Sequence, residues 1–266
     1  MDHSTGFQDH QRLNLLGVKV SEVTIPLAVD IIDGWIRSHR KVYVCVAPVS
    51  TLVDCQKNDD YKNIVNRAGM VTPDGMPVVW LGKASGSRVI ERTYGPDLML
   101  ALTQAGQTKK YRHFFYGGQP ETMDLLGKKL KAKFPDVNIV GKYSPVFVPY
   151  AQQESREIID LINKIKPDIL WVGLGSPKQD FWMSLHRSLL EVPVMIGVGA
   201  AFDFISGVKP QAPLWMQKSS LEWVFRLLSE PRRLWKRYLV GNVRFLYYVG
   251  CDGIKRLFKV FYSASL

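Results

Sequence analysis

The sequence has 266 residues, of which 46% are hydrophobic and 22% are charged. This composition is enough for the core of one sizeable domain and excludes a disordered chain. Lys and Arg total 35 against 24 Asp and Glu, so the formal net charge of +11 predicts an anionic partner such as a nucleotide, a nucleic acid or an acidic lipid surface.

Strand-like and helix-like segments alternate along most of the chain. Short runs of β-branched and aromatic residues predict strands at 42–49, 111–116, 137–143, 169–174 and 194–198. Apolar residues at three- and four-residue spacing predict helices at 95–105, 121–133 and 154–166. This alternation is typical of a parallel sheet with helices on both faces, so we predict a Rossmann-like α/β domain over residues 1–207.

A turn signature follows the apolar pair Met70 and Val71. Thr72-Pro-Asp-Gly places the carboxylate of Asp74 between a proline and a glycine. Pro-Asp-Gly is an ordinary turn, so a structural role stands beside a functional one, in which Asp74 is a general base for an acceptor hydroxyl. Further along, Arg92 supplies a cation for substrate binding, and Pro96-Asp97 predicts the start of a helix.

Small residues follow three of the predicted strands. Backbone N–H groups in a glycine turn before a helix form a site for a nucleotide diphosphate, although such a turn can also be purely structural. The segment from Gly173 to Lys178 matches neither G-x-G-x-x-G nor a Walker loop. The segment after the third of these strands contains Asp203, where we expect a helix cap, with a ligand contact as the alternative. The candidate nucleotide-binding residues are Gly117, Gly118, Gly173, Gly175, Ser176, Lys178, Gly199 and Asp203.

The character of the sequence changes after Gly207. Residues 209–266 contain 11 Lys and Arg against three Asp and Glu, interleaved with 11 Trp, Tyr and Phe. A basic and aromatic mixture of this kind predicts a helical appendage, residues 208–266, that lies in an anionic membrane interface. A solvated basic helix pair and a nucleic-acid-binding surface are the alternatives.

The sequence predicts neither a metal site nor an exported protein. It has no D-x-D pair, and its five histidines lack metal-ligand spacing, so cations and helix N-termini would stabilise a leaving diphosphate. Three widely spaced cysteines argue against a disulfide framework and against structural zinc. The first twenty residues carry charges and no apolar core, and no apolar run is long enough to span a bilayer, so we expect a cytoplasmic protein.

Five segments together resemble the WecG/TagA/CpsF family, glycosyltransferase family 26. In the family's order they are TPDGMPVVW (72–80), ERTYGPDL (91–98), GLGSPKQD (173–180), IGVGAAFDFISG (196–207) and APLWMQKSSLEWVFRLLSEPRRLWKRY (212–238). The resemblance implies a compact Rossmann-like fold of the GT-E type and metal-independent, inverting transfer of a hexose from a UDP-sugar, without a cofactor. It also implies an acceptor sugar on a polyprenyl diphosphate at the cytoplasmic membrane face, in polysaccharide or cell-wall polymer synthesis, and is compatible with a homo-oligomer.

The resemblance further implies roles for individual residues. Asp74 would deprotonate the acceptor hydroxyl as it attacks the anomeric carbon, and Gln179 would contact the donor or the acceptor. Arg226, Arg233 and Lys236 would close over the site and neutralise the diphosphate, while the same appendage docks on the membrane.

The chain departs from the family pattern in three places. Members that make an N-acetylmannosaminyl linkage usually carry Thr or Ala, any residue and then Asn at the end of an early strand, where this chain has Ala47-Pro48-Val49. Asp180 replaces the usual Glu, and Gln211 replaces an Arg. The donor therefore stays open among N-acetylmannosamine, glucose and related hexoses.

Two other classes of function are weighed against this interpretation. An NAD-dependent oxidoreductase would share the α/β alternation, but the chain lacks the full glycine fingerprint and the acidic residue about twenty positions beyond it. A non-catalytic module would bind membrane or nucleic acid through the basic tail, but it leaves Asp74 and Gln179 without a purpose.

Overall fold

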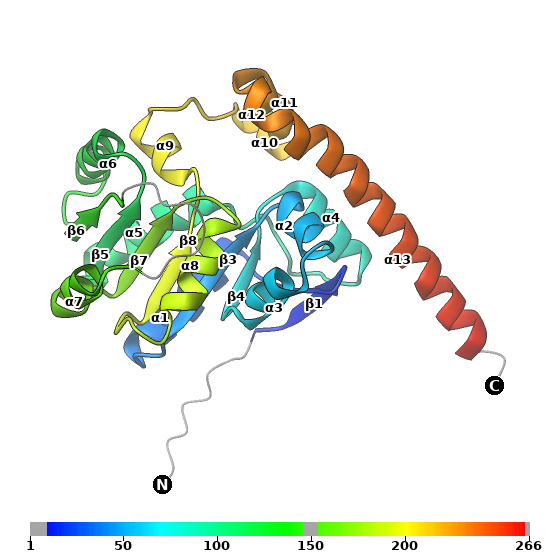
Figure 1. Cartoon of the computed structure of the whole chain (residues 1–266), viewed down its shortest axis with the longest axis horizontal. Helices are drawn as coiled ribbons and strands as arrows, with labels where there is room; N and C mark the ends of the chain where they lie inside the picture. Colours follow the sequence, from blue (N-terminus) through cyan, green and yellow to red (C-terminus); the bar gives the residue numbers. More distant parts are fainter. Residues whose placement is uncertain (1–9, 146–153, 264–266) are drawn as a thin grey trace, which may run out of the picture.

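A central sheet is covered by helices on both sides, and a long C-terminal helix runs along one side of the molecule (Figure 1). The structure, a computed structural model, describes residues 10–145 and 154–263, with side chains up to residue 254. The predicted fold class, a Rossmann-like α/β sheet with a helical C-terminal part, is confirmed.

The sheet has six parallel strands in the order β4-β3-β8-β7-β5-β6. The five predicted strands are present to within two residues. Four of them are short, mostly buried runs, whereas β6 lies at the edge of the sheet and has no fully buried residue. The sixth, β4, has only four residues and was read from the sequence merely as an apolar stretch before a turn. The strands are β3 (Val42–Ala47), β4 (Met70–Pro73), β5 (Arg112–Gly117), β6 (Asn138–Tyr143), β7 (Ile169–Gly173) and β8 (Val194–Gly197).

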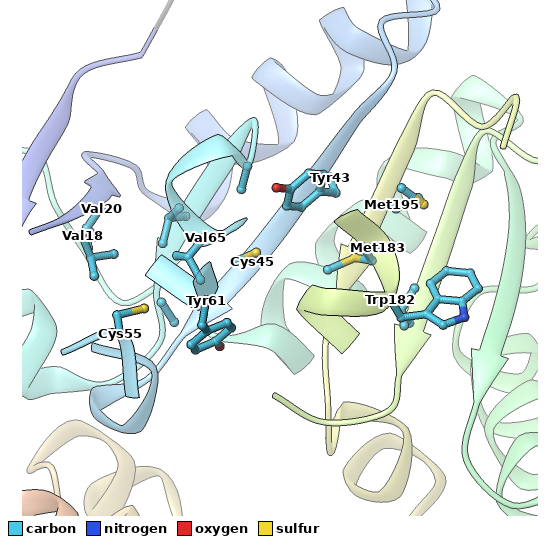
Figure 2. Close-up of a cluster of buried hydrophobic side chains, with 14 of the residues drawn as sticks. Val18, Val20, Tyr43, Cys45, Cys55, Tyr61, Val65, Trp182, Met183 and Met195 are labelled. Atoms are coloured by element: carbon cyan, nitrogen blue, oxygen red, sulfur yellow. The ribbon is translucent and has the colours of Figure 1, made fainter. Parts of the chain in front are cut away.

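Two sets of helices bury the two faces of the sheet. One apolar core joins the sheet to α1 (Ile25–Arg37), α5 (Gly95–Lys109), α6 (Pro120–Lys133) and α9 (Ala201–Ser206). The other joins it to α2 (Val49–Cys55), α3 (Asp59–Arg67), α4 (Met76–Ala84), α7 (Arg156–Ile165) and α8 (Lys178–His186). Figure 2 shows this second core, where side chains of the hairpin, β3, α3 and α8 pack together.

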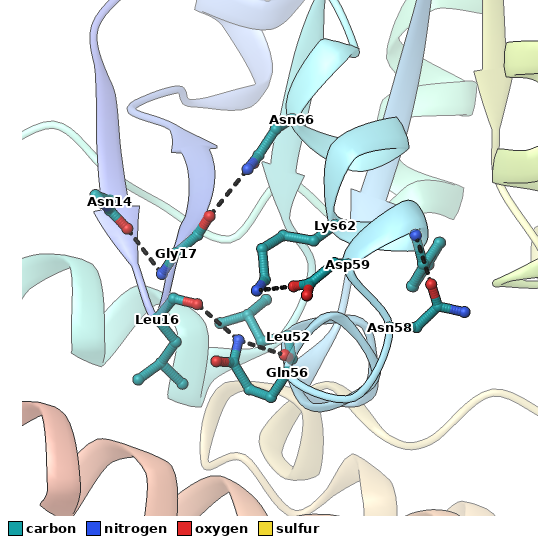
Figure 3. A network of polar contacts seen from close by, with 10 residues as sticks. Asn14, Leu16, Gly17, Leu52, Gln56, Asn58, Asp59, Lys62 and Asn66 are labelled. Atoms are coloured by element: carbon teal, nitrogen blue, oxygen red, sulfur yellow. Dashed lines mark hydrogen bonds and ion pairs between the residues drawn. The ribbon is translucent and has the colours of Figure 1, made fainter.

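An antiparallel hairpin, β1 (Arg12–Leu15) and β2 (Val18–Ser21), precedes the sheet and was not predicted. Its turn is held by side chains of the helices beside it (Figure 3). Gln56 Nε2 donates to the carbonyl of Leu16 at 2.6 Å, and Asn66 Nδ2 donates to the carbonyl of Gly17 at 2.9 Å. The hairpin thereby holds α2 and α3 in place, and α2 begins directly after β3 at the edge that carries the site.

Gly207 is the C-cap of α9 and adopts a left-handed conformation with a φ of +83°. The appendage begins after this residue. Its helices are α10 (Leu214–Lys218), α11 (Glu222–Ser229), α12 (Pro231–Trp235), a π-helical turn (Lys236–Val240) and α13 (Gly241–Ser263). Phe245 of α13 is buried in the same core as α2, so the appendage packs on the domain. Within the described residues, no helix combines the length and the apolar character needed to span a bilayer.

Candidate active site

Asp74 lies at the carboxyl end of β4, where the chain turns into α4. Its backbone N–H donates to the carbonyl of Ala47 at 3.3 Å, which ties the turn to the end of the neighbouring strand β3. Gly75 caps the amino end of α4, and Pro77 occupies its first turn. The Pro-Asp-Gly sequence is therefore a real turn, and the turn holds the carboxylate at the edge of the sheet where ligands of α/β proteins bind.

The carboxyl group of Asp74 is in an unusual environment. Its Oδ1 atom is buried and accepts no hydrogen bond from any residue that the structure describes. Burial raises the pKa of Asp74 to about 6, with a further contribution from Glu222, against the opposing charges of Arg92, Arg226 and Arg237. A carboxylate with raised basicity and a free acceptor atom has the properties of a general base.

A cavity of about 610 Å³ opens beside Asp74, between the sheet edge and the appendage. The turn and α4 form one wall, the start of α2 forms another, and the third is formed by α10, α11, the π-helical turn and α13. Its charged lining residues are Asp74, Arg92, Glu222, Arg226 and Arg237. The cavity therefore brings the predicted base together with cations from the predicted appendage.

Arg92 connects the Asp74 turn to the appendage. Its Nε donates to the carbonyl of Asp74 at 2.9 Å, and its Nη1 donates to Gln217 Oε1 of α10 at 3.0 Å. It also forms an ion pair with Glu222 of α11 and lies 4.0 Å from the ring centroid of Tyr94. Since Tyr94 donates to the same Glu222 at 2.9 Å, the sequence-predicted cation is held as part of a polar network that joins α10 and α11 to the domain.

Two arginines of the appendage reach the cavity. Arg226 of α11 was predicted, and its guanidinium carbon lies 5.3 Å from the ring centroid of Phe204. Arg237 was not predicted, and its Nε donates to Ser50 Oγ of α2 at 3.1 Å. Their positive charges are placed where a diphosphate beside Asp74 would be neutralised.

The structure places the other two predicted cations outside the cavity. Arg233 is exposed and pairs with Glu230, and the Lys236 ammonium lies 5.4 Å from the ring centroid of Trp235. The π-helical turn that begins at Lys236 changes the helical register there, and it is the next residue, Arg237, that faces the cavity. No contact in the described residues tests whether Arg233 and Lys236 bind substrate, so their role stays a prediction.

Gln179 lies in the first turn of α8 and is 2% exposed. Its Oε1 accepts hydrogen bonds from the backbone N–H groups of Gly175 at 3.1 Å and Gly199 at 2.9 Å. Its Nε2 donates to Ser176 Oγ at 3.2 Å. The side chain therefore joins the loops that follow β7 and β8, and it does not line the cavity.

None of the candidate nucleotide-binding residues lines the cavity beside Asp74. Close packing accounts for two of the glycines: a Cβ on Gly117 would meet the backbone of Gly173 at 2.8 Å, and a Cβ on Gly173 would meet the ring of Phe202 at 2.4 Å. Gly175 differs, because it has a φ of +79° and faces open space. The binding role of the strand-end glycines, Ser176 and Lys178 stays a prediction.

The helix cap expected at Asp203 is wrong. α9 begins at Ala201, with Ala200 at the N-cap position, so Asp203 lies inside the first turn. Its carboxylate forms an ion pair with Lys209 at 2.9 Å instead. The helix starts earlier than predicted because the chain turns directly after β8, at the positive φ of Gly199.

Positive charge in the cavity comes from guanidinium groups. Among the residues that the structure describes, no group of His, Cys, Asp and Glu is placed to hold a metal ion. Cys45 and Cys55 are free and buried, away from the cavity lining.

Comparison with known proteins adds to this geometry. The family model described as "Glycosyl transferase WecG/TagA/CpsF family" matches residues 13–258. A protein of Bacillus spizizenii (strain W23) named N-acetylglucosaminyldiphosphoundecaprenol N-acetyl-beta-D-mannosaminyltransferase is 32% identical over 205 residues, 77% of each chain. Proteins with the same name from Bacillus subtilis (strain 168) and Staphylococcus aureus (strain MW2) are 33% and 25% identical, over 69% and 88% of each chain.

Proposed function

Since the chain belongs to the WecG/TagA/CpsF family of glycosyl transferases, we propose that it transfers a hexose from a UDP-sugar to a sugar carried on a polyprenyl diphosphate. The three relatives are named for N-acetylmannosaminyl transfer to such a carrier, so N-acetylmannosamine is the first donor sugar to test. Val49, at the position where the resemblance expects an Asn, keeps glucose and other hexoses among the candidates.

The observation that carries the proposal is the unpaired carboxylate of Asp74 in a cavity that also contains Arg226 and Arg237. In the proposed step, Asp74 takes the proton of the acceptor hydroxyl as its oxygen attacks the anomeric carbon. The new C–O bond forms on the face opposite the UDP, the bond to the diphosphate breaks, and the configuration is inverted. UDP leaves with the bonding electron pair, and the two guanidinium groups neutralise its charge in place of a metal ion.

The pKa of Asp74 suits this role. At about 6 it leaves most of the carboxylate deprotonated at neutral pH, yet makes it more basic than an exposed aspartate. Arg92 donates a hydrogen bond to the backbone carbonyl of Asp74, so the carboxylate is positioned before substrate binds.

We further propose that the enzyme works as a peripheral protein at the cytoplasmic face of the membrane, where a lipid-linked acceptor is found. Support comes from large apolar side chains that the appendage exposes beside its cations, such as Trp215 and Leu228, which are 63% and 77% exposed. Further basic and aromatic residues predicted to take part lie outside the described side chains, namely Lys255, Arg256, Phe258, Lys259, Phe261 and Tyr262.

The test is a donor screen with the full chain. UDP-N-acetylmannosamine, UDP-glucose and UDP-N-acetylglucosamine are each incubated with an N-acetylglucosaminyl diphosphate prenyl acceptor, and the product is detected by mass spectrometry. We expect one donor to be used, and we expect Asp74→Asn to lower the rate by at least about a hundredfold while UDP binding is kept.

Asp97→Asn is the matched control, because Asp97 is another carboxylate whose pKa burial raises, but it does not line the cavity. It should retain transfer. Absence of transfer from all three donors would contradict the proposed substrates, and unchanged turnover in Asp74→Asn would remove Asp74 from the mechanism.

A further inference from the structure

Much of the cavity beside Asp74 is apolar, and neither a sugar nor a diphosphate accounts for that. Two helices form this apolar part. Its lining residues on α4 are Met76, Pro77, Trp80, Leu81 and Ala84, and those on α13 are Phe245, Leu246 and Val249. A hexose presents hydroxyl groups and a diphosphate presents charge, so both need polar partners, whereas an apolar wall that extends along two helices suits an apolar occupant.

Both helices lead away from the charged end of the cavity. α4 starts at Met76, two residues after Asp74. Its lining residues recur at three- and four-residue spacing from Met76 to Ala84, a rise of about 12 Å along the helix axis. On the other wall, the lining residues follow the same spacing from Arg237 to Val249. The cavity therefore changes from charged to apolar with distance from the proposed reaction centre.

The apolar end of the cavity opens to the surface. Trp80 and Leu246 line it and are still 51% and 69% exposed. Next to Leu246 on α13, Val243 and Tyr247 are 68% and 67% exposed, and they belong to the apolar surface of the appendage. An apolar chain that enters from a membrane would remain in apolar surroundings up to the charged end of the cavity.

We propose that the part of the cavity between α4 and α13 binds the first isoprene units of the acceptor's lipid carrier. This inference rests on the proposed function and identifies how the acceptor is held. A sugar-bearing prenyl diphosphate is an apolar chain that ends in a polar, charged head, and the cavity has the matching order: an apolar channel and then a charged end that contains Asp74. The site would place the sugar beyond the diphosphate within reach of the base.

The test measures binding without any donor sugar. Radiolabelled farnesyl diphosphate and inorganic diphosphate are compared by equilibrium dialysis against the full chain. We expect the farnesyl compound to bind at least about tenfold more tightly, since several of its methylene and methyl groups leave water.

Two variants of α13 form a matched pair. Leu246→Ser removes an exposed apolar side chain that lines the cavity, and Val243→Ser removes an equally exposed one that does not. Leu246→Ser should weaken farnesyl diphosphate binding about fivefold to tenfold, whereas Val243→Ser should change it less than about twofold. Ala84→Trp, which fills the channel from the exposed end of α4, should weaken it as well. Inorganic diphosphate should bind all four proteins alike.

Equal affinity for farnesyl and inorganic diphosphate, or equal losses in Leu246→Ser and Val243→Ser, would overturn the prenyl site. The donor screen gives the separate answer on transfer. A chain that transfers a hexose but shows no preference for the farnesyl tail would overturn only the prenyl site. A chain that binds the tail as expected but transfers no hexose would contradict only the proposed reaction.

Discussion

A single carboxylate carries the proposed chemistry, and its environment has a thermodynamic consequence. Asp74 is ionised at neutral pH although burial raises its pKa to about 6, above the ordinary 3.8 of the unfolded chain. The folded protein therefore binds this proton more tightly than the unfolded protein does, so the ionised form destabilises the fold above pH 6 and the effect fades as the pH falls towards 4.

Asp74→Asn should for this reason be more stable than the parent protein at pH 8. The buried charge is removed, and we expect the free energy of unfolding to rise by about 1 to 3 kcal/mol. Urea unfolding at pH 8 and pH 4 measures the change. The difference between the two proteins should be much smaller at pH 4, and an equal difference at both pH values would contradict the destabilising role of the charge.

Individual site residues differed in how far the sequence could identify them. Asp74, Arg92 and Arg226 were found because they stand in recognisable segments, and all three line the cavity. Lys236 was predicted from the family resemblance, whereas its neighbour Arg237, in the same π-helical turn, is the cation that lines the cavity. A resemblance in sequence alone does not specify which of two adjacent cations faces the cavity.

At the scale of elements, Gln179 joins two loops that leave neighbouring strands. Its Oε1 is the shared acceptor for the backbone N–H groups of Gly175 and Gly199. Gln179→Leu removes that acceptor within a closely packed region, so we expect the free energy of unfolding to fall by about 1 to 3 kcal/mol. Gln179→Glu keeps a carbonyl-type acceptor in the same place and is the matched control at pH 4, where burial keeps its carboxyl group neutral.

Urea unfolding of both variants separates packing from hydrogen bonding. The glutamate variant should lie much closer to the parent protein than the leucine variant. Equal losses of stability in the two variants would contradict the account, because they would show that the accepted hydrogen bonds contribute little.

Helices and strands were predicted from the sequence where their apolar residues form a clear pattern. The strands β3, β5, β7 and β8 are mostly buried and are rich in apolar residues, and α5, α6 and α7 carry apolar residues on one side. The edge strand β6 is partly exposed and was predicted from its shorter apolar stretch. The hairpin and β4 have strands of only four residues, too short for a recognisable alternation. The sequence of α1 has apolar residues at helical spacing, but several of them are isoleucine and valine, which favour strands. Its sequence therefore does not distinguish a helix from a strand.

For the molecule as a whole, the appendage is both a wall of the cavity and the proposed contact with the membrane. The full chain should sediment with vesicles that contain anionic phospholipid, because each cation near such a surface contributes about 1 kcal/mol. It should sediment less at high salt and less with neutral vesicles, since salt screens surface charge.

Leu228→Ser tests the apolar part of this contact. Leu228 lies on α11 and is 77% exposed, so its loss should weaken sedimentation without unfolding the chain. The matched control is Leu161→Ser on α7, an exposed leucine of the α/β domain that is outside the appendage. Equal sedimentation of the two variants would contradict membrane contact through the appendage.

The central claim is that the base and the appendage meet in one cavity, and the pH dependence of kcat/KM tests it most directly. The value of kcat/KM should fall below a pH of about 6 as Asp74 takes up a proton, because burial raises the pKa of Asp74. In Arg237→Gln this fall should move to higher pH, since a cation that lowers the pKa of Asp74 is gone. Arg244→Gln changes an exposed cation of α13 outside the cavity, so the fall in kcat/KM should occur at the same pH as in the parent protein. A fall that does not move in Arg237→Gln, or a profile with no fall near pH 6, would contradict the claim.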